Sequence, residues 1–188
     1  QNASGVNAFA VYRTSASENM AQVNTAGVYN NTFTYTLPPQ SVTTFNQILS
    51  SPPANGTYKI INKNSGLAMD LIAGNEANLA PINQWAPASN DANQDWMLAP
   101  LSNGNYGIIS GLTAMGAAIQ GGSKSNGTQL VDWPYTTTDS SLQFKLISEG
   151  SGWYEIQNVN SGLVLDDNAN GTSNGTTIVQ WTPSGANN

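Results

Sequence analysis

Carboxylates, carboxamides and tryptophans are the side chains of this sequence that suit chemistry at a site. The chain of 188 residues has 11 Asp and Glu and five Trp, but no His and no Cys. Without imidazole or thiol groups, Ser–His and Cys–His nucleophile pairs and zinc sites built on nitrogen or sulfur are excluded. What remains for chemistry is hydrogen bonding by carboxylates and carboxamides and the apolar faces of the indole rings.

The charge balance excludes two classes of partner. Five Lys and Arg against 11 acidic residues give a net charge of −6, and so few basic groups cannot form a phosphate-reading patch. The sequence also has no apolar stretch long enough to span a bilayer. We therefore expect no nucleic-acid partner and no membrane partner, and no metal or cofactor.

Three local patterns fall short of the motifs that they resemble. The run DDNANG at 166–171 starts like a calcium loop, but Thr177 stands where the closing Glu belongs. The run GSKSNG at 122–127 imitates a phosphate loop, but Thr128 follows where Lys is required. The two adjacent carboxylates of the first run point to opposite faces if they lie on a strand. We therefore expect no catalytic carboxylate pair on this chain.

A repeat of 48 residues runs through the chain from Gly56 onward. Trp85, Trp133 and Trp181 are separated by this interval. The units begin GTYKIINKNSGLAMDL, GNYGIISGLTAMGAAI and GWYEIQNVNSGLVLDD, and their middles read PINQW, QLVDW and TIVQW. So many matches at one interval indicate an internal repeat, which is typical of a fold built from equivalent units.

Each unit alternates β-prone runs with turn signals. In the first unit these runs are 58–61, 67–71, 81–85 and 96–98, and Asn64-Ser65-Gly66 is a turn in which glycine tolerates positive φ. Strands at intervals near ten residues, without helical periodicity, predict an all-β sandwich or barrel. Four strands repeated three times predict a closed barrel with a threefold axis, which removes most exposed sheet edges.

The recurring residues resemble the ricin-type β-trefoil, also called carbohydrate-binding module family 13. The pattern is read here as Gly56, Tyr58, Asn64-Ser65-Gly66-Leu67, Asp70, Gln84-Trp85 and Asn93-Gln94-Asp95-Trp96. The resemblance implies an all-β fold with a β-trefoil of three 48-residue repeats over residues 56–188. The last repeat is expected to be truncated, because the aromatic residue one interval after Phe144 would fall beyond Asn188.

The same resemblance implies where a saccharide binds. In the first unit the matching residues are Asp70, Asn83, Trp85, Asn93 and Gln94. We expect the Asp70 carboxylate to be a surface acceptor for two hydroxyls, Asn93 to add a donor and Trp85 to stack on the sugar. Trp96 and Phe144 are expected to pack inside the barrel.

The other two units match the binding pattern less well. In the third unit the matching residues are Asp166, Trp181, Asn187 and Asn188, and Val179 departs from the polar pattern. Ala118 replaces the aspartate of the second unit, so we expect no site there. As an alternative, the recurring tryptophans are scaffold residues, and the aspartates fix turns through local bonds to the backbone.

The first 47 residues lie outside the repeat. Residues 7–14 and 32–45 have strand composition, and Phe33, Tyr35 and Leu37 alternate with threonines as in a half-buried strand. Residues 6–46 resemble the last strands of the C-terminal β-domain of glycoside hydrolase family 30. That resemblance implies that residues 1–47 are β-sandwich strands that pack on a (β/α)8 barrel with two catalytic glutamates. We expect residues 48–55 to be a linker.

Six Asn-X-Ser/Thr triplets indicate N-glycosylation and therefore a secreted, extracellular protein. They begin at Asn2, Asn30, Asn55, Asn126, Asn170 and Asn174. Chance is the alternative, because the chain is rich in Asn, Ser and Thr. The sequence begins at Gln1 without a signal peptide or initiator methionine, so we expect a mature or excised product.

The expected function is carbohydrate binding by the non-catalytic module of a secreted glycoside hydrolase. The resemblances imply a galactose- or xylose-containing oligo- or polysaccharide as the ligand, and a xylanase, β-1,6-galactanase or glucanase as the parent enzyme. One alternative is a stand-alone lectin that uses its amino-terminal strands for packing or oligomerisation. The other is a structural fragment that binds no sugar.

Overall fold

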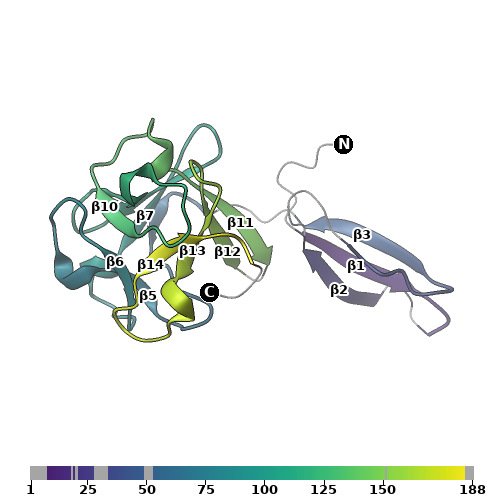
Figure 1. The fold of residues 1–188 in the computed structure, drawn as a ribbon. Helices are drawn as coiled ribbons and strands as arrows, with labels where there is room; N and C mark the ends of the chain where they lie inside the picture. The colour runs from purple at the N-terminus through teal and green to yellow at the C-terminus, as the bar shows by residue number, and fades with distance from the viewer. Residues whose placement is uncertain are drawn as a thin grey trace. The chain divides into compact units, whose positions relative to one another are not determined.

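The chain forms two compact units. The computed structural model describes residues 8–17, 19, 21–27, 34–48, 53–150 and 152–184. One unit consists of Gln1–Pro52 with Ile147–Tyr154, and the other of Pro53–Leu146 with Glu155–Asn188 (Figure 1). In the described part of the chain, no helix is long and apolar enough to cross a membrane.

The amino-terminal unit contains an antiparallel sheet of three strands in the order β2-β1-β3. The strands are β1 (Ala8–Thr14), β2 (Ala21–Gly27) and β3 (Val42–Ile48). Phe45 of β3 makes edge-on ring contacts with Phe9 and Tyr35, with ring centroids 6.3 Å and 5.3 Å apart. Together with the buried Val11, these rings give the sheet its apolar face.

The strand predicted over residues 32–45 is wrong in its first part. Residues 34–41 belong to no strand, and Leu37 is exposed. The reason is chemical, because Pro38 and Pro39 have no N–H to donate to a strand ladder. The strand therefore starts at Val42, and Phe33 lies outside the described residues.

Three repeats of short strands make up the larger unit, apart from residues 147–154 between the second and third repeats, which belong to the other unit. The first repeat has β4 (Gly56–Tyr58), β5 (Ala68–Leu71), β6 (Ile82–Trp85) and β7 (Trp96–Pro100). The second has β8 (Tyr106–Ser110), β9 (Gly116–Ile119), β10 (Leu130–Trp133) and β11 (Phe144–Gly150). The third has β12 (Trp153–Asn158), β13 (Val164–Asp167) and β14 (Ile178–Trp181). The predicted all-β class and the threefold repeat are confirmed.

Short 3-10 turns connect these strands at equivalent places. They are η1 (Ile72–Gly74), η2 (Ala92–Gln94), η3 (Gln120–Gly122), η4 (Ser140–Leu142) and η5 (Asn168–Asn170). Three of them, η1, η3 and η5, follow the second strand of a repeat, and η2 and η4 precede the fourth. The η2 and η4 turns begin after an aspartate whose carboxylate accepts a backbone N–H, Asp91 in the first repeat and Asp139 in the second.

The strands form a barrel sheet and three hairpins. β7 pairs with β4 and β8, β8 pairs with β11, and the sheet continues to β12. The hairpins are β5–β6, β9–β10 and β13–β14, one in each repeat. Isolated bridges join the hairpins pairwise, from Pro81 to Val131, Asn83 to Thr177 and Gln129 to Val179. Each hairpin therefore meets both others around an approximate threefold axis.

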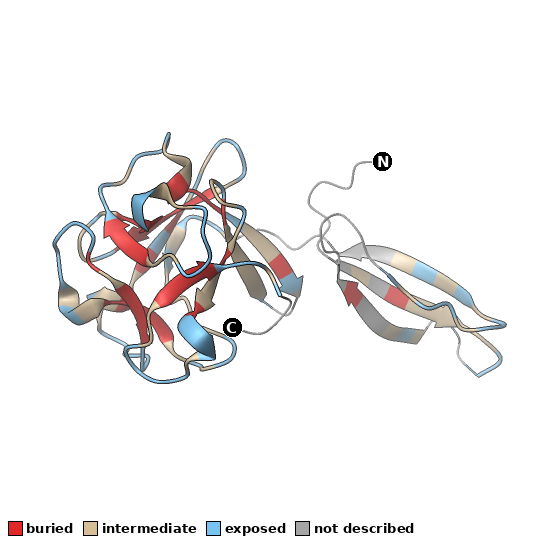
Figure 2. Cartoon of the chain, viewed as in Figure 1, coloured by how far each residue is buried: buried red, intermediate tan, exposed pale blue. Residues whose placement is uncertain are grey.

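The core lies where the hairpins and the barrel strands meet (Figure 2). Trp96 and Phe144, which open the fourth strand of the first two repeats, are fully buried. The indole Nε1 of Trp96 donates a hydrogen bond to the carbonyl oxygen of Met69 at 2.9 Å. Both aromatic rings thus pack in the barrel, as expected from the sequence.

A hydrogen bond between two side chains recurs in every repeat. It joins the turn after the first strand to the buried third strand: Ser65 to Gln84 at 2.6 Å, Thr113 to Asp132 at 2.6 Å and Ser161 to Gln180 at 2.7 Å. The hydroxyl donates and the amide or carboxylate oxygen accepts. The predicted turn at Gly66 has φ +72°, which glycine adopts without strain.

Asp167 places a carboxyl group in the apolar core. It is 2% exposed and occupies the position of Leu71 and Ile119 in the other repeats. Its Oδ2 atom is buried without a hydrogen-bond partner. Burial, with a smaller contribution from the neighbouring Asp166 carboxylate, raises the pKa of Asp167 to about 6. The third repeat therefore carries a buried carboxyl group at a core position where the other two repeats have an aliphatic side chain.

We expect this carboxyl group to make the protein more stable in acid. Because the pKa of Asp167 lies above its usual 3.8, folding takes up a proton, and the free energy of unfolding should rise as the pH falls from about 6 to about 4. Asp167→Leu should remove the part of this dependence that Asp167 causes and stabilise the protein at pH 7.5 by on the order of 2–3 kcal/mol. Burial also raises the pKa of Asp70 and of Asp132, so their smaller contributions should remain. Urea unfolding at pH 4.5, 6 and 7.5 measures both effects.

Asp166→Asn is the matched control, because it removes only the neighbouring charge and should give a smaller gain at pH 7.5. The interpretation is wrong if Asp167→Leu gains no more stability at pH 7.5 than at pH 4.5.

Candidate functional site

The first repeat carries polar side chains on the outer face of its hairpin. Asp70 of β5 and Asn83 of β6 are cross-strand partners. Their neighbours Leu71 and Ile82 lie in the core, so Asp70 and Asn83 face the other way, because side chains alternate along a strand. Trp85 shares this outer face and is 46% exposed. Three of the predicted site residues therefore lie on one face.

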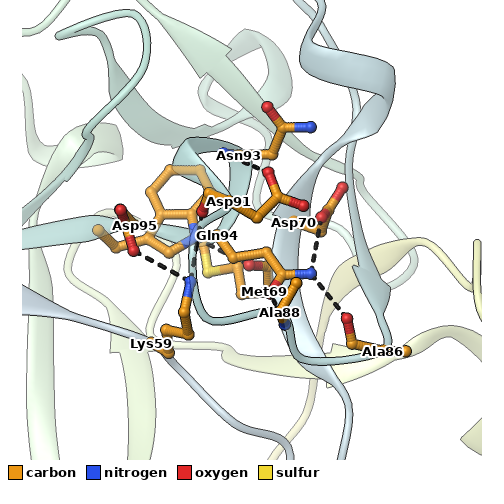
Figure 3. A network of polar contacts seen from close by, with 10 residues as sticks. Lys59, Met69, Asp70, Ala86, Ala88, Asp91, Asn93, Gln94 and Asp95 are labelled. Carbon is orange, nitrogen blue, oxygen red and sulfur yellow. Dashed lines mark hydrogen bonds and ion pairs between the residues drawn. The ribbon is translucent and has the colours of Figure 1, made fainter.

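Asp70 differs from the expected surface acceptor. Its side chain is only 5% exposed, and its Oδ2 atom accepts a hydrogen bond from Gln94 Nε2 at 3.0 Å (Figure 3). The Oδ1 atom bonds no described residue. Burial raises the pKa of Asp70, and the bond from Gln94 partly opposes this. The carboxylate is thus a fixed, nearly enclosed acceptor with one oxygen available.

Gln94 closes the loop in front of Asp70. Its Nε2 atom also donates to the carbonyl oxygen of Ala86 at 3.0 Å, and its Oε1 atom accepts from the backbone N–H of Ala88 at 2.9 Å. The side chain is fully buried. Its amide is therefore used inside the protein, and Gln94 positions Asp70 rather than facing a ligand.

Asn93 lies on the short turn η2 next to Gln94. Its backbone N–H donates to Asp91 Oδ1 at 3.1 Å, which fixes the start of the turn. A Cβ atom built on Gly74 would lie 3.2 Å from Asn93 Oδ1, so η1 and η2 are in close contact. Asp91, Asn93 and Gln94 thus come from one loop, which packs against the outer end of β5 (Figure 3).

Two residues at this site were missed by the sequence analysis. Asp91 is near enough for its charge to raise the pKa of Asp70 further. Lys59 Nζ donates to the carbonyl oxygen of Asp91 at 3.3 Å and to Asp95 Oδ1 at 3.0 Å, so it clamps the η2 loop from both ends. The repeat could have pointed to Lys59, because only the first unit has a basic residue at this position. Gly107 and Glu155 stand there in the other two units.

Asn83 is the unusual member of the set. It is 1% exposed, and its Oδ1 atom is buried without a partner in the described structure. Val131 and Val179 occupy the equivalent positions of the other repeats. A buried amide oxygen without a partner costs free energy, and it lies on the same face as Asp70.

The second repeat fills the same place with apolar groups. Ala118, Val131 and Leu142 form a small buried cluster against Tyr135. The ring of Tyr135 lies against two glycines, since a Cβ atom on Gly107 or Gly116 would come within 3.0 Å of it. The hydroxyl of Tyr135 is buried without a partner, and burial raises its pKa. Among the described residues of the second repeat, Ala118 and Val131 thus stand where the first repeat has Asp70 and Asn83.

The third repeat keeps part of the polar face. Asp166 is half-buried opposite Val179, and Trp181 is 45% exposed. Asp167 pairs with Ile178 on the core face, so the two adjacent carboxylates point apart, as predicted. Asn187 and Asn188 lie outside the described residues.

The described N-glycosylation triplets begin at exposed asparagines. These are Asn55, Asn126, Asn170 and Asn174, and Asn2 and Asn30 lie outside the described residues. The sequence alone predicts acceptors but not their surroundings. Two of them, Asn126 and Asn174, lie in equivalent turns before the third strand of a repeat.

Comparison with known proteins identifies relatives of this architecture. A family model described as ricin-type β-trefoil lectin domain-like matches residues 44–133 and 93–181. The designed threefold-symmetric protein ThreeFoil is 27% identical, with a TM-score of 0.67, over 70% of this chain and 93% of that protein. No curated protein sequence matches.

Two natural proteins share the fold. An exo-β-1,3-galactanase from Clostridium thermocellum is 23% identical with a TM-score of 0.67, over 95% of this chain but only 40% of the galactanase. The C-terminal half of an earthworm R-type lectin, solved in complex with GalNAc, is 20% identical with a TM-score of 0.54, over 70% of this chain and 92% of that chain.

The packing of Tyr135 leads to a stability prediction. Because its hydroxyl is buried without a partner, Tyr135→Phe should leave the protein as stable or raise the free energy of unfolding by about 1 kcal/mol. The matched control is Tyr106→Phe, which removes a hydroxyl that donates to the carbonyl oxygen of Pro53 at 3.0 Å and should cost about 1 kcal/mol. Chemical unfolding of both variants checks this, and a clear loss of stability in Tyr135→Phe would contradict the packing.

Proposed function

The chain belongs to the ricin-type β-trefoil lectin domain-like family, and on that basis we propose that it binds carbohydrate through its first repeat. The first-repeat site is defined here by Asp70, Asn83, Trp85, Asp91 and Asn93. Gln94 positions this set from behind. We propose further that the module is of the carbohydrate-binding module family 13 type.

One observation carries the proposal: two nearly enclosed polar groups, Asp70 and Asn83, lie beside the exposed indole of Trp85. In this proposal the Oδ1 oxygen of Asp70, which bonds no described residue, accepts a ligand hydroxyl, and the indole covers an apolar sugar face. The second repeat has the same backbone but an apolar filling at this place. The polar set is therefore a feature of one repeat and not a requirement of the fold.

The ligand class follows from the charges at the site. Asp70 and Asp91 are acceptors of hydrogen bonds, and the only described cation nearby, Lys59, is held by Asp95. Such a site favours neutral sugars, because an acidic sugar would meet like charge. We propose a galactose- or xylose-containing oligo- or polysaccharide. The earthworm lectin solved with GalNAc supports the galactose side of this class.

A weaker second site is proposed in the third repeat. Asp166 and Trp181 supply an acidic group and an exposed ring there, with Asn187 and Asn188 as its proposed amides. Val179 removes the polar partner that Asn83 supplies in the first repeat. Two linked sites of unequal strength would raise the avidity for a polymer without any new contact.

We propose that the parent protein is a secreted glycoside hydrolase of the family 30 type, a xylanase, β-1,6-galactanase or glucanase. In this proposal residues 1–47 are the last strands of a β-sandwich that packs on a catalytic (β/α)8 barrel, residues 48–55 are a linker, and residues 56–188 are the binding module. The likeness to the galactanase supports this context because it extends over most of the chain. Exposed glycosylation triplets support secretion.

An alternative is a stand-alone lectin whose amino-terminal strands serve packing or oligomerisation. The exposure of Leu37 and Val42 in that unit favours it. Reading the coding sequence before Gln1 distinguishes the two. A (β/α)8 barrel with two glutamates is the expected result, and a start codon directly before Gln1 would contradict the enzyme context.

Removal of the Asp70 carboxylate tests the binding site itself. Asp70→Ala should weaken binding of arabinogalactan or xylan by about 10- to 100-fold, because a hydrogen bond to a charged group is lost. The free energy of unfolding should fall by only about 1 kcal/mol, since the bond from Gln94 is lost as well. Titration calorimetry and urea unfolding measure the two quantities.

Asp166→Ala is the matched control in the third repeat, and we expect it to affect binding less. If Asp70→Ala is folded and binds both polysaccharides as tightly as the unchanged protein, the first repeat is not the binding site.

A further inference from the structure

We propose that Asn174 carries an N-linked glycan whose first sugar packs on the indole of Trp85 and covers the apolar part of the first-repeat site. The glycan of the third repeat would then compete with an external saccharide for the site of the first. The effect on binding rests on the proposed function, whereas the position of the glycan does not.

The repeats interlock at the turns that precede each third strand. The turn of the third repeat pairs with Gln84, because Gly175 N–H donates to Gln84 O at 2.9 Å and Gln84 N–H donates to Thr176 O at 2.9 Å. The turn of the second repeat pairs with Gln180 in the same way, through Gly127 and Thr128. The turn of the third repeat therefore lies beside Trp85, which follows Gln84. The turn of the second repeat lies beside Trp181, which follows Gln180.

The turn of the third repeat is in contact with the Trp85 ring. A Cβ atom on Gly175 would lie 3.7 Å from Trp85 Cζ3, which is ordinary van der Waals distance. Asn174 is the next residue along the chain and is exposed, and Trp85 is 46% exposed. A sugar linked to the Asn174 amide is thus attached within reach of an open indole face.

The sequence at this turn is an acceptor for glycosylation. Asn174-Gly175-Thr176 has the required pattern, whereas Asn78-Leu79-Ala80 at the equivalent place in the first repeat lacks the hydroxyl residue. In the transfer, Asn174 Nδ2 forms a bond to C1 of N-acetylglucosamine in a lipid-diphosphate oligosaccharide. The C1–O bond to the diphosphate breaks, the lipid diphosphate leaves and the amide loses one proton.

The equivalent turn of the second repeat provides an internal comparison. Asn126 also lies in an acceptor triplet, but its Oδ1 atom accepts a hydrogen bond from Thr182 at 3.1 Å. Ala86 occupies the place of Thr182 next to Trp85, so it cannot hold Asn174 in that way. A glycan at Asn126 would also lie beside Trp181 and away from the first-repeat site.

Packing of the glycan on Trp85 is favourable for general reasons. The first sugar, N-acetylglucosamine, presents C–H groups and a methyl group, and an exposed indole is an apolar surface with a broad face. A covalent link keeps the sugar at a millimolar effective concentration, so even a weak contact is populated. The attached sugar therefore excludes an external ligand from Trp85 but leaves Asp70 and Asn83 in place.

The test uses protein secreted by a yeast host in which Trp133 and Trp181 are replaced by Phe. This protein is compared with two variants of it, Asn174→Gln and Asn126→Gln. Mass spectrometry of the peptide that contains residue 174 should show N-acetylhexosamine. Acrylamide quenching of tryptophan fluorescence should increase in Asn174→Gln and stay unchanged in Asn126→Gln. Binding of arabinogalactan should tighten by roughly tenfold in Asn174→Gln, because an intramolecular competitor is removed.

An unmodified Asn174, or quenching that is the same with and without the Asn174 glycan, would overturn the proposal. The same protein made in a bacterial cytosol carries no glycan and tests the proposed function separately. If that protein binds no polysaccharide, the proposed function is refuted. The quenching experiment still decides whether the glycan packs on Trp85. If it binds, and the yeast protein binds equally well with Asn174 fully modified, competition by the glycan is refuted.

Discussion

The buried bond between a hydroxyl and a side-chain oxygen is the interaction on which the rest of the trefoil depends. It ties a turn to the third strand in each repeat, at 2.6–2.7 Å. In two repeats the acceptor is a glutamine whose amide also reaches another repeat: Gln84 Nε2 donates to Gly171 O at 2.6 Å, and Gln180 Nε2 donates to Ser123 O at 3.0 Å. A polar group in a protein interior has to be satisfied, so these bonds fix the register between repeats as well as within them.

This inner framework leaves the outer face of each hairpin free to vary. The first repeat places Asp70 and Asn83 there, the second places Ala118 and Val131, and the third places Asp166 and Val179. The backbone pairing is the same in all three. A change on the outer face alters what the repeat presents without disturbing the apolar core. A polar outer face in one repeat and a closely packed apolar one in another are therefore compatible with one architecture.

The sequence was sufficient for the repeat, the strands within it and the aromatic core, because the 48-residue interval aligns equivalent residues in three copies. Trp96 and Phe144 are buried as that alignment requires. It was insufficient for the environment of Asp70, since burial of a side chain depends on the loop that returns over it. The loop closed by Gln94 and clamped by Lys59 is formed by contacts between residues more than 20 positions apart. Tyr135 was missed for the same reason, because two distant glycines make room for its ring.

Asp132 breaks the pattern of the inner framework in one respect. It takes the place of Gln84 and Gln180, but a carboxylate has no N–H to donate, and its Oδ1 atom is buried without a partner. Among the described residues, the bonds from Asp132 to the turn of the first repeat are two backbone bonds, Leu79 N–H to Asp132 O and Asp132 N–H to Ala80 O, both 2.9 Å. This junction therefore lacks the side-chain bonds that Gln84 and Gln180 make at the other two. We expect amide hydrogen exchange by local opening to be faster at this turn of the first repeat than at the equivalent turns of the other two.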